Sequence, residues 1–174
     1  MKILSEAEGQ DWLRRNCQID DAKLTYFFGQ SVAYLIPPDS GRKTALARLL
    51  RGCLKYGTEG VFWITGWGVW PSSENIGLFD AYRKSLGEQR PLHDAPFHIF
   101  TEADATELEC LLDLALYFFW DAILIDGLHT TAFRISHDEY IELYAKDNVS
   151  RTALTDVLER AHLRRMPRPV NDRP

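Results

Sequence analysis

The stretch AILIDGLHTTAFRI, residues 122–135, decides the fold of this chain. Its two ends, residues 122–125 and 131–135, are short apolar runs with β-branched and aromatic side chains, which are typical of strands. Asp126 and Gly127 between them are turn residues. We therefore expect two antiparallel strands joined by a short turn, and so a β-sheet at the centre of the fold.

Further strands are predicted upstream of this hairpin. The apolar runs of strand length are residues 31–36, 61–64 and 96–100. The first of them must end at Pro37, because proline cannot donate to a ladder. Residues 24–28 are predicted as one more strand, which pairs with the run at 31–36 as a hairpin.

Helices are predicted between these strands from apolar spacings of three and four residues and from capping side chains. Ser5 with Glu8 has the capping-box pattern, and so has Thr101 with Asp104. The string SHDE at residues 136–139 has the same pattern and predicts a helix directly after the hairpin. The predicted helices cover residues 5–15, from 39 or 40 to a stop at Gly57, from 72 or 73 to a stop at Gly87, 101–119, 136–144 and 150–164.

This order of elements predicts an α/β fold, with α+β as the alternative. The sheet should be mixed, with four to six strands, flanking helices and the hairpin in the C-terminal half of the chain. The pattern leaves open whether helices cover one face of the sheet or both. A chain of 174 residues suits a single domain, here residues 1–165. The proline- and arginine-rich tail, residues 166–174, should be disordered.

The composition is that of an ordinary globular protein, with 45% hydrophobic and 26% charged residues. A net charge of -5 argues against general binding to nucleic acid, which depends on clustered lysine and arginine. The N-terminus has no apolar segment of signal-peptide length, and the longest apolar stretch, residues 114–120, is too short to span a bilayer. We therefore expect a soluble, cytoplasmic protein that binds neither nucleic acid nor membranes.

The cysteines also indicate a cytoplasmic protein. Cys17, Cys53 and Cys110 are odd in number, far apart and without a CxxC pair, as expected of reduced thiols in the cytosol. Cys53 and Cys110 fall within apolar helical patterns, so we expect both in the core.

Motifs for nucleotide, metal or nucleophilic chemistry are missing from the sequence. GRKT at residues 41–44 follows a strand, but Pro37 and Pro38 stand where a phosphate-binding loop needs glycine and free amides. We expect a capped helix start with solvated charges there. The histidines lack zinc-site spacing and there is no GxSxG. The sequence therefore predicts no cofactor and no metal, and favours a protein that is not an enzyme.

The segment ITGWGVWPSSEN, residues 64–75, is the candidate functional surface. It follows the C-terminal end of a strand, where open α/β sheets present ligand sites. Trp67 and Trp70 are predicted in this connection, and large aromatic side chains there suit a protein, a peptide or a stacked ring. The alternative is that both fold back over the core, where Trp63 of the preceding strand should lie.

The sequence contains five distinctive motifs, one of which lies within this turn. They are WGVWPSSEN, LFDAYRKSLGE, APFHIF, FFWDA and SHDEY, within about residues 61–144. In this order and spacing they resemble a family of uncharacterised bacterial proteins. The resemblance implies a shared fold and assigns no chemistry to any residue. A small acidic domain with exposed aromatic residues also resembles, in style, immunity proteins that neutralise bacterial toxins, which implies a protein partner.

Two functions follow from these observations. The leading hypothesis is a non-enzymatic, immunity-like module that binds a protein partner or a second copy of itself through residues 64–75. The alternative is an enzyme or small-ligand-binding protein with a pocket near Glu74, Arg83 and His98. The candidate binding residues are Trp67, Trp70, Ser73, Glu74, Asn75, Arg83, His98 and His137.

Overall fold

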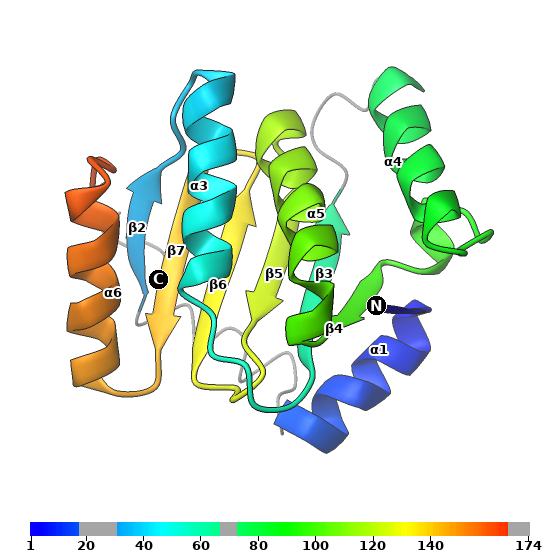
Figure 1. The fold of residues 1–174 in the computed structure, drawn as a ribbon, viewed down its shortest axis with the longest axis horizontal. Helices are drawn as coiled ribbons and strands as arrows, with labels where there is room; N and C mark the ends of the chain where they lie inside the picture. The colour runs from blue at the N-terminus through cyan, green and yellow to red at the C-terminus, as the bar shows by residue number, and fades with distance from the viewer. Residues whose placement is uncertain (18–30, 67–72, 167–174) are drawn as a thin grey trace, which may run out of the picture.

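Seven strands form one antiparallel sheet in the computed structural model, which describes residues 1–17, 31–66 and 73–166, apart from the side chains of residues 73–76 and 92 (Figure 1). Their order across the sheet is β1-β4-β3-β5-β6-β7-β2. The strands are β1 (Lys2–Leu4), β2 (Val32–Leu35), β3 (Gly60–Gly66), β4 (Phe97–Phe100), β5 (Asp121–Ile125), β6 (Thr131–Ser136) and β7 (Tyr140–Ala145).

Helices pack on both faces of this sheet. α3 (Ser40–Gly52) and α5 (Ala105–Phe118) run over one face, with α4 (Ser73–Ser85) and α6 (Asn148–Arg160) at its two ends (Figure 1). α1 (Glu6–Trp12) packs on the opposite face. In the described ranges, none of the helices has the length and apolar character needed to cross a membrane. The short helical turns are η1 (Leu13–Cys17), η2 (Leu92–Asp94) and η3 (Glu102–Asp104).

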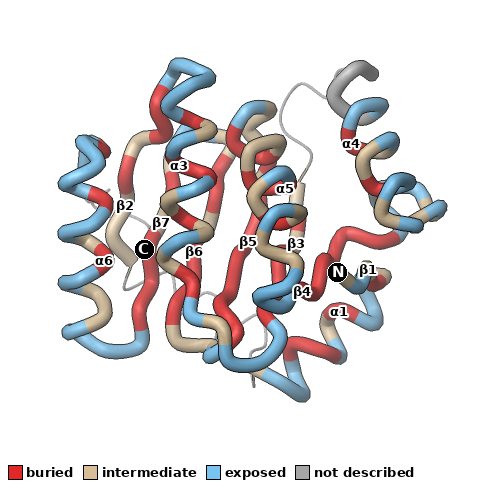
Figure 2. Tube along the Cα trace, in the orientation of Figure 1, coloured by how far each residue is buried: buried red, intermediate tan, exposed pale blue. Residues whose placement is uncertain are grey.

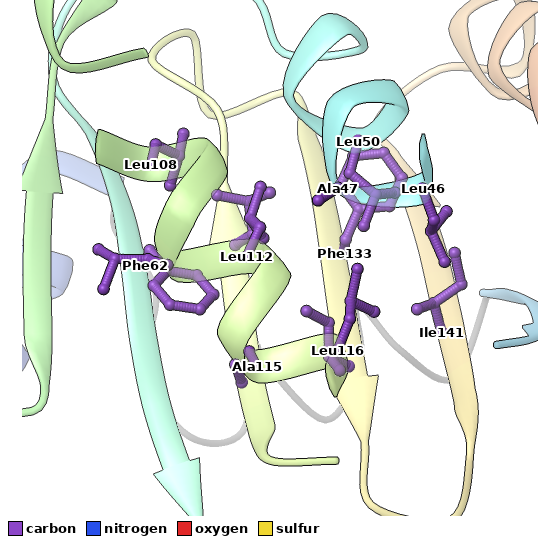
Figure 3. Packing of buried hydrophobic residues seen from close by; sticks show 14 of the residues in the cluster. Leu46, Ala47, Leu50, Phe62, Leu108, Leu112, Ala115, Leu116, Phe133 and Ile141 are labelled. Carbon is purple, nitrogen blue, oxygen red and sulfur yellow. The ribbon is translucent and has the colours of Figure 1, made fainter. Parts of the chain in front are cut away.

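The larger apolar core lies between the sheet and α3 and α5. Phe62, Leu124 and Phe133 stand opposite one another in a row across β3, β5 and β6. Leu112 of α5 and Leu50 of α3 belong to the same buried cluster (Figure 3). Because side chains alternate along a strand, this row uses every second residue of each strand.

A smaller core covers the other face. Ile99, Val61 and Ile125 form its row across β4, β3 and β5, one residue out of step with the first row. Trp12 and Leu13, at the junction of α1 and η1, close it. The central strands are therefore buried on both faces (Figure 2).

The structure confirms most of the predicted elements. β5 and β6 pair antiparallel, as the hairpin at residues 122–135 predicts. Both capping boxes are present, at Ser5 with Glu8 and at Thr101 with Asp104. The predicted strands before the hairpin are β2, β3 and β4. The strand prediction at residues 24–28 falls outside the described residues.

The fold class is the α+β alternative, because the sheet is antiparallel throughout and not mixed. Its seven strands also exceed the predicted four to six. The two additional strands are β1 and β7. β1 has only three residues, too few to show the period of two by which strands are recognised.

The helix predicted at residues 136–144 is wrong, because this segment forms a turn and strand β7. Ile141 and Leu143 are buried on the same face of the sheet, at the spacing of two that a strand requires. The hydroxyl of Ser136 accepts a hydrogen bond from the backbone N–H of Asp138 at 3.2 Å. It therefore closes the β6–β7 turn, where a local side-chain bond competes with helix capping.

Of the two helix ends predicted at glycines, the one at Gly87 is confirmed and the one at Gly57 is wrong. Gly87, two residues after α4, has φ +91°, the left-handed conformation that ends helices. α3 ends at Gly52, well before the predicted stop at Gly57. A Cβ on Gly57 would lie 2.2 Å from a methyl carbon of Leu128, so close packing accounts for this glycine.

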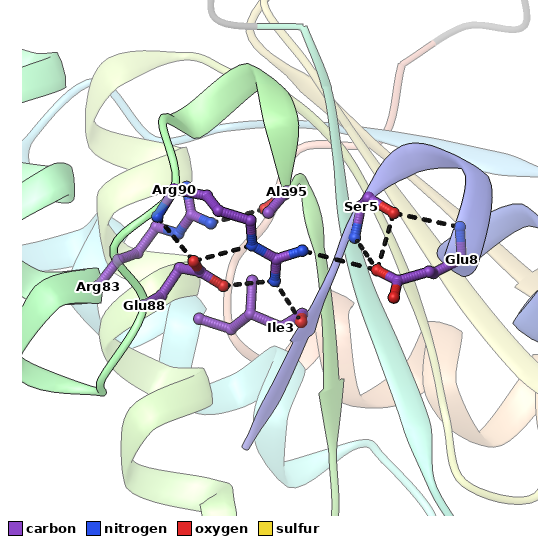
Figure 4. A network of polar contacts seen from close by, with 7 residues as sticks. All are labelled: Ile3, Ser5, Glu8, Arg83, Glu88, Arg90 and Ala95. Atoms are coloured by element: carbon purple, nitrogen blue, oxygen red, sulfur yellow. Dashed lines mark hydrogen bonds and ion pairs between the residues drawn. The ribbon is translucent and has the colours of Figure 1, made fainter.

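The outer edge of β1 is covered by side chains. Nη2 of Arg90 donates to the carbonyl of Ile3 at 2.8 Å, and Nε of Arg90 donates to Glu88 at 2.9 Å (Figure 4). Glu8 of α1 lies 3.6 Å from the same guanidinium group. This network leaves little free hydrogen-bonding capacity along a strand of three residues.

The outer edge of β2 is covered by backbone. Leu35 donates to the carbonyl of Arg164 and Met166 donates to the carbonyl of Ala33, both at 2.9 Å. The predicted tail therefore begins with a residue that is bound to the sheet, and residues 167–174 lie outside the described residues.

Candidate functional site

The upper edge of the sheet in Figure 1 gathers several connections. We define the upper edge as residues 36–40, 64–66, 118–122 and 136–140. The register brings them together, because Gly66 is opposite Asp121, and Ser136 and Leu35 are both opposite Tyr140. The turn predicted as the functional surface, residues 64–75, therefore starts at the upper edge.

Only part of that turn can be described. β3 extends through Gly66, and α4 starts at Ser73. Trp63, predicted to be in the core, is half-buried and stacks on Phe97 with ring centroids 4.6 Å apart. The predicted binding residues outside the described part are Trp67 and Trp70, together with the side chains of Ser73, Glu74 and Asn75.

An aromatic cluster lies at the upper edge. Trp120 is 1% exposed and lies between Phe79 of α4, at a centroid distance of 4.9 Å, and Phe118 of α5, at 5.6 Å. Leu78 and Tyr117, the neighbours of these two residues in sequence, are each 53% exposed. We call these five residues the Trp120 cluster. It combines buried Trp120 and Phe79 and half-buried Phe118 with two exposed side chains.

The other large apolar side chains found exposed in the described ranges lie elsewhere. Val149 and Val157 are on α6, at the opposite end of the helical layer, and Leu128 is in the β5–β6 turn (Figure 1). The Trp120 cluster differs from them in that exposed Tyr117 contacts the ring of Phe118, which packs on buried Trp120.

His137 is bound to Asp121 at the upper edge. The Asp121 carboxylate accepts from the backbone N–H of His137 at 2.9 Å and lies 2.8 Å from its Nδ1. The hydrogen bond to Asp121, followed by the charge of Asp121, raises the pKa of His137. The same carboxylate packs on Gly66, where a Cβ would lie 2.8 Å from Oδ2. This close approach requires glycine at the end of β3.

A histidine oriented by a carboxylate is one part of a nucleophilic site. Nε2 of His137, however, lies 3.5 Å from Oδ1 of Asp138. Within the described ranges, no hydroxyl or thiol is hydrogen-bonded to Nε2. The pair therefore places a partly exposed, readily protonated side chain at the upper edge.

Lys43 contradicts the expectation of a solvated charge in the GRKT segment. Its side chain is 5% exposed, and Nζ lies 3.7 Å above the ring centroid of Phe119. Burial lowers the pKa of Lys43, and the charges of Glu139 and Asp39 oppose this effect. The lysine therefore connects α3 to the α5–β5 junction by a cation–π contact.

Arg83 and His98 form a second group, between α4 and β4. Both are 0% exposed. The ring of Phe79 contacts both, 5.9 Å from the ring centroid of His98 and 5.7 Å from Cζ of Arg83. Nη2 of Arg83 donates to the carbonyl of Ala95 at 2.8 Å (Figure 4). In the part of the chain that the structure describes, Nε and Nη1 of Arg83 and Nε2 of His98 are buried without hydrogen-bond partners.

The hydrogen bonding of His98 defines its tautomer. Nδ1 lies 3.2 Å from the carbonyl oxygen of Phe62, which can only accept. Nδ1 therefore carries the proton, and Nε2 is an unprotonated acceptor. Burial, followed by the charge of Arg83, lowers the pKa of His98 to about 3. His98 is neutral at physiological pH.

The charge of Arg83 is buried without an ion pair of its own in the described part of the chain. Glu88 and Asp80 act on it from a distance, but their carboxylates bind other side chains. Glu88 accepts from Arg90 at 2.9 Å, and Asp80 lies 3.1 Å from Nζ of Lys84. Burial lowers the pKa of Arg83 because the charged form loses hydration.

The structure brings Arg83 and His98 together and places His137 elsewhere. His98 is in the same cross-strand row as Phe133 of β6, three strand spacings away, which is about 14 Å. His137 lies four residues beyond Phe133, about a further 13 Å along the strand direction. One small pocket cannot include all three candidate residues.

The residues of the Trp120 cluster were not predicted as functional from the sequence, and neither were Lys43 and Asp121. Tyr117 carried a signal, since it lies off the apolar stripe of α5 and an aromatic residue there faces solvent. The pairing of Asp121 with His137 depends on the register of β5 and β6, which was not predicted. Burial of Lys43 had no signal in the sequence.

The cysteines are all free. Cys53 is half-buried and packs against the larger core, whereas Cys110 is exposed, contrary to the core position predicted for it. Cys110 lies on the face of α5 that points away from Leu108, Leu111 and Leu112. Within the described ranges, no three histidine, cysteine or acidic residues are grouped so as to hold a metal ion.

Comparison with protein-family models, with curated proteins and with solved structures gave no match to this chain.

Proposed function

We propose that this protein is a non-enzymatic binding module and that its partner is a protein, which binds at the upper edge against the Trp120 cluster. The observation that carries the proposal is the exposure of Leu78 and Tyr117, each of which directly precedes an aromatic residue, Phe79 or Phe118, that packs on buried Trp120. Interface hot spots are typically large side chains on rigid, well-packed support. The predicted turn at residues 64–75 starts at the same edge.

The charges of the upper edge favour a basic partner. Asp39, Asp138 and Glu139 are exposed there, whereas Lys43 is withdrawn onto the ring of Phe119. The chain as a whole has a net charge of -5. Complementary charge would speed association with a basic protein and exclude acidic ones.

An immunity-like role in the cytoplasm belongs to the same proposal. Such a protein acts by covering its target, so it requires an exposed surface and no catalytic group. The position of His137 Nε2, beside Asp138 and with no nucleophile of the described residues bonded to it, supports binding over catalysis.

The test compares proteins enriched on immobilised wild type with those enriched on Tyr117→Ala, Leu78→Ala and Val149→Ala. Val149 is 81% exposed on α6 and serves as the matched control. We expect one protein to be retained by wild type and Val149→Ala and to be lost from the other two. The purified partner should then bind Tyr117→Ala about 30-fold more weakly, as loss of a hot spot of about 2 kcal/mol requires.

Sedimentation of the wild type shows whether the partner is a second copy of the chain, in which case Tyr117→Ala should dissociate the dimer. The proposal is overturned if every binding protein, and any self-association, is indifferent to both substitutions in the Trp120 cluster.

A further inference from the structure

Three buried nitrogen atoms between α4 and β4 have no hydrogen-bond partner among the described residues: Nε and Nη1 of Arg83 and Nε2 of His98. Both side chains are fully buried, so bulk water does not reach them. Buried polar atoms in native proteins nearly always have partners, and each exception calls for an explanation. Here the exceptions come from two separate elements that meet at Phe79.

The three nitrogen atoms need different kinds of hydrogen-bond partner. The two nitrogens of Arg83 can only donate. Nε2 of His98 can only accept, because Nδ1 donates to the carbonyl of Phe62. A species that satisfies both residues must therefore accept hydrogen bonds on one side and donate one on the other.

The positive charge of Arg83 restricts the bound species to an anion. Arg83 is a buried cation, and its acidic neighbours Glu88 and Asp80 bind Arg90 and Lys84 instead. Figure 4 shows Glu88 held by Arg90, while the guanidinium of Arg83 reaches the carbonyl of Ala95. A negative group between Arg83 and His98 would compensate the charge that no carboxylate of the described residues compensates.

We propose that Arg83 and His98 bind a small oxyanion that retains a hydroxyl group, such as hydrogen carbonate or hydrogen phosphate. Its oxygen atoms accept from Nε and Nη1 of Arg83, and its hydroxyl donates to Nε2 of His98. Nitrate and acetate offer oxygen atoms without a hydroxyl, so they satisfy Arg83 alone and bind more weakly. The complete burial of both side chains restricts the ligand to a few heavy atoms.

The experiment titrates the full chain near neutral pH with sodium hydrogen carbonate, sodium phosphate, sodium nitrate and sodium acetate at equal ionic strength. Two signals are followed: the ¹H–¹⁵N resonance of Arg83 Nε and the midpoint of thermal unfolding. We expect hydrogen carbonate or phosphate to shift the resonance and, at ten times Kd, to raise the midpoint by about 3–6 °C. Comparison of these two shows which oxyanion fits, and nitrate and acetate should bind at least tenfold more weakly.

Two variants separate the roles of the residues. His98→Asn keeps a donor for the carbonyl of Phe62 and removes the Nε2 acceptor, so it should bind hydroxyl-bearing anions no better than nitrate. Arg83→Gln should lose the response to all four salts. Arg48→Gln, which removes a 67% exposed arginine, is the control and should respond like wild type.

A wild-type resonance and midpoint that do not respond to hydrogen carbonate or phosphate at tens of millimolar would overturn the proposal. So would equal binding of nitrate by the wild type, or an unchanged preference in His98→Asn. These outcomes can be observed even if the Arg83→Gln protein does not fold. They are also independent of the partner-binding test, which uses residues that do not contact Arg83 or His98.

Discussion

Two histidines in this protein have opposite electrostatic surroundings. His137 lies at the solvent-facing upper edge, where the Asp121 carboxylate holds its Nδ1 and raises its pKa. His98 is fully buried, and burial together with Arg83 lowers its pKa to about 3. The same side chain is therefore readily protonated in one region and kept neutral in the other. The difference shows that partner and burial, and not residue type, decide the charge that each histidine carries.

Trp120→Ala should have the largest effect, because Trp120 connects the two regions. It packs on Phe79, which contacts His98, and it directly precedes Asp121, which holds His137. Loss of this buried ring should lower the free energy of unfolding by about 3–5 kcal/mol, as measured by urea denaturation. Tyr117→Ala is the control and should change it by less than about 0.5 kcal/mol. A small loss in Trp120→Ala would mean that the two regions are supported separately.

His98→Asn should have the next largest effect, and it should depend on pH. A histidine with a pKa of about 3 in the folded state and 6.5 when unfolded takes up its proton only on unfolding. Its contribution to stability is thus present above pH 6.5 and is lost as the pH falls from 6.5 towards 3.

Between pH 7 and pH 5, the wild type should therefore lose about 2 kcal/mol more of its free energy of unfolding than His98→Asn does. Denaturation at both pH values gives the difference. Parallel losses in the two proteins would show that His98 is accessible to protons in the folded state.

Asp121→Asn should have the smallest effect and the opposite sign. Without the carboxylate, the pKa of His137 should fall towards its ordinary value of 6.5. Because the pKa is raised in the wild type, the pair stabilises the fold below pH 6.5, and this contribution is lost as the pH rises through the raised pKa. A titration of the His137 ring protons by NMR measures the shift. The ring protons of His98 provide the internal reference, since they should not titrate above pH 5.

Local patterns were sufficient to predict much of the fold. The capping boxes at Ser5 and Thr101 depend on residues three apart, so they are visible in the sequence. The SHDE string at residues 136–139 has the same composition but a different structure. Ile141 and Leu143 bury a strand face against β6, and this tertiary packing outweighs the local preference for a helix.

The candidate site was less predictable, because it depends on contacts between distant elements. Asp121 and His137 are 16 residues apart and meet only through the register of β5 and β6. The burial of every residue of β4, His98 included, requires α4 on one face and α1 on the other, and neither follows from the alternation within β4. Arg83 and His98 were nevertheless predicted as members of one group, and the structure brings them together at Phe79.

The covered outer edge of β2 has a consequence for how this chain behaves at high concentration. The backbone groups of Ala33 and Leu35 are occupied by residues 164–166 of the same chain. If residues 164–166 detached, β2 would become an open template for strands of other molecules, as in domain swapping and fibril growth. β1, at the opposite end of the sheet, has only three residues, and Arg90 occupies the carbonyl of Ile3, so this edge offers little backbone for pairing. The segment after α6 is therefore a safeguard against aggregation.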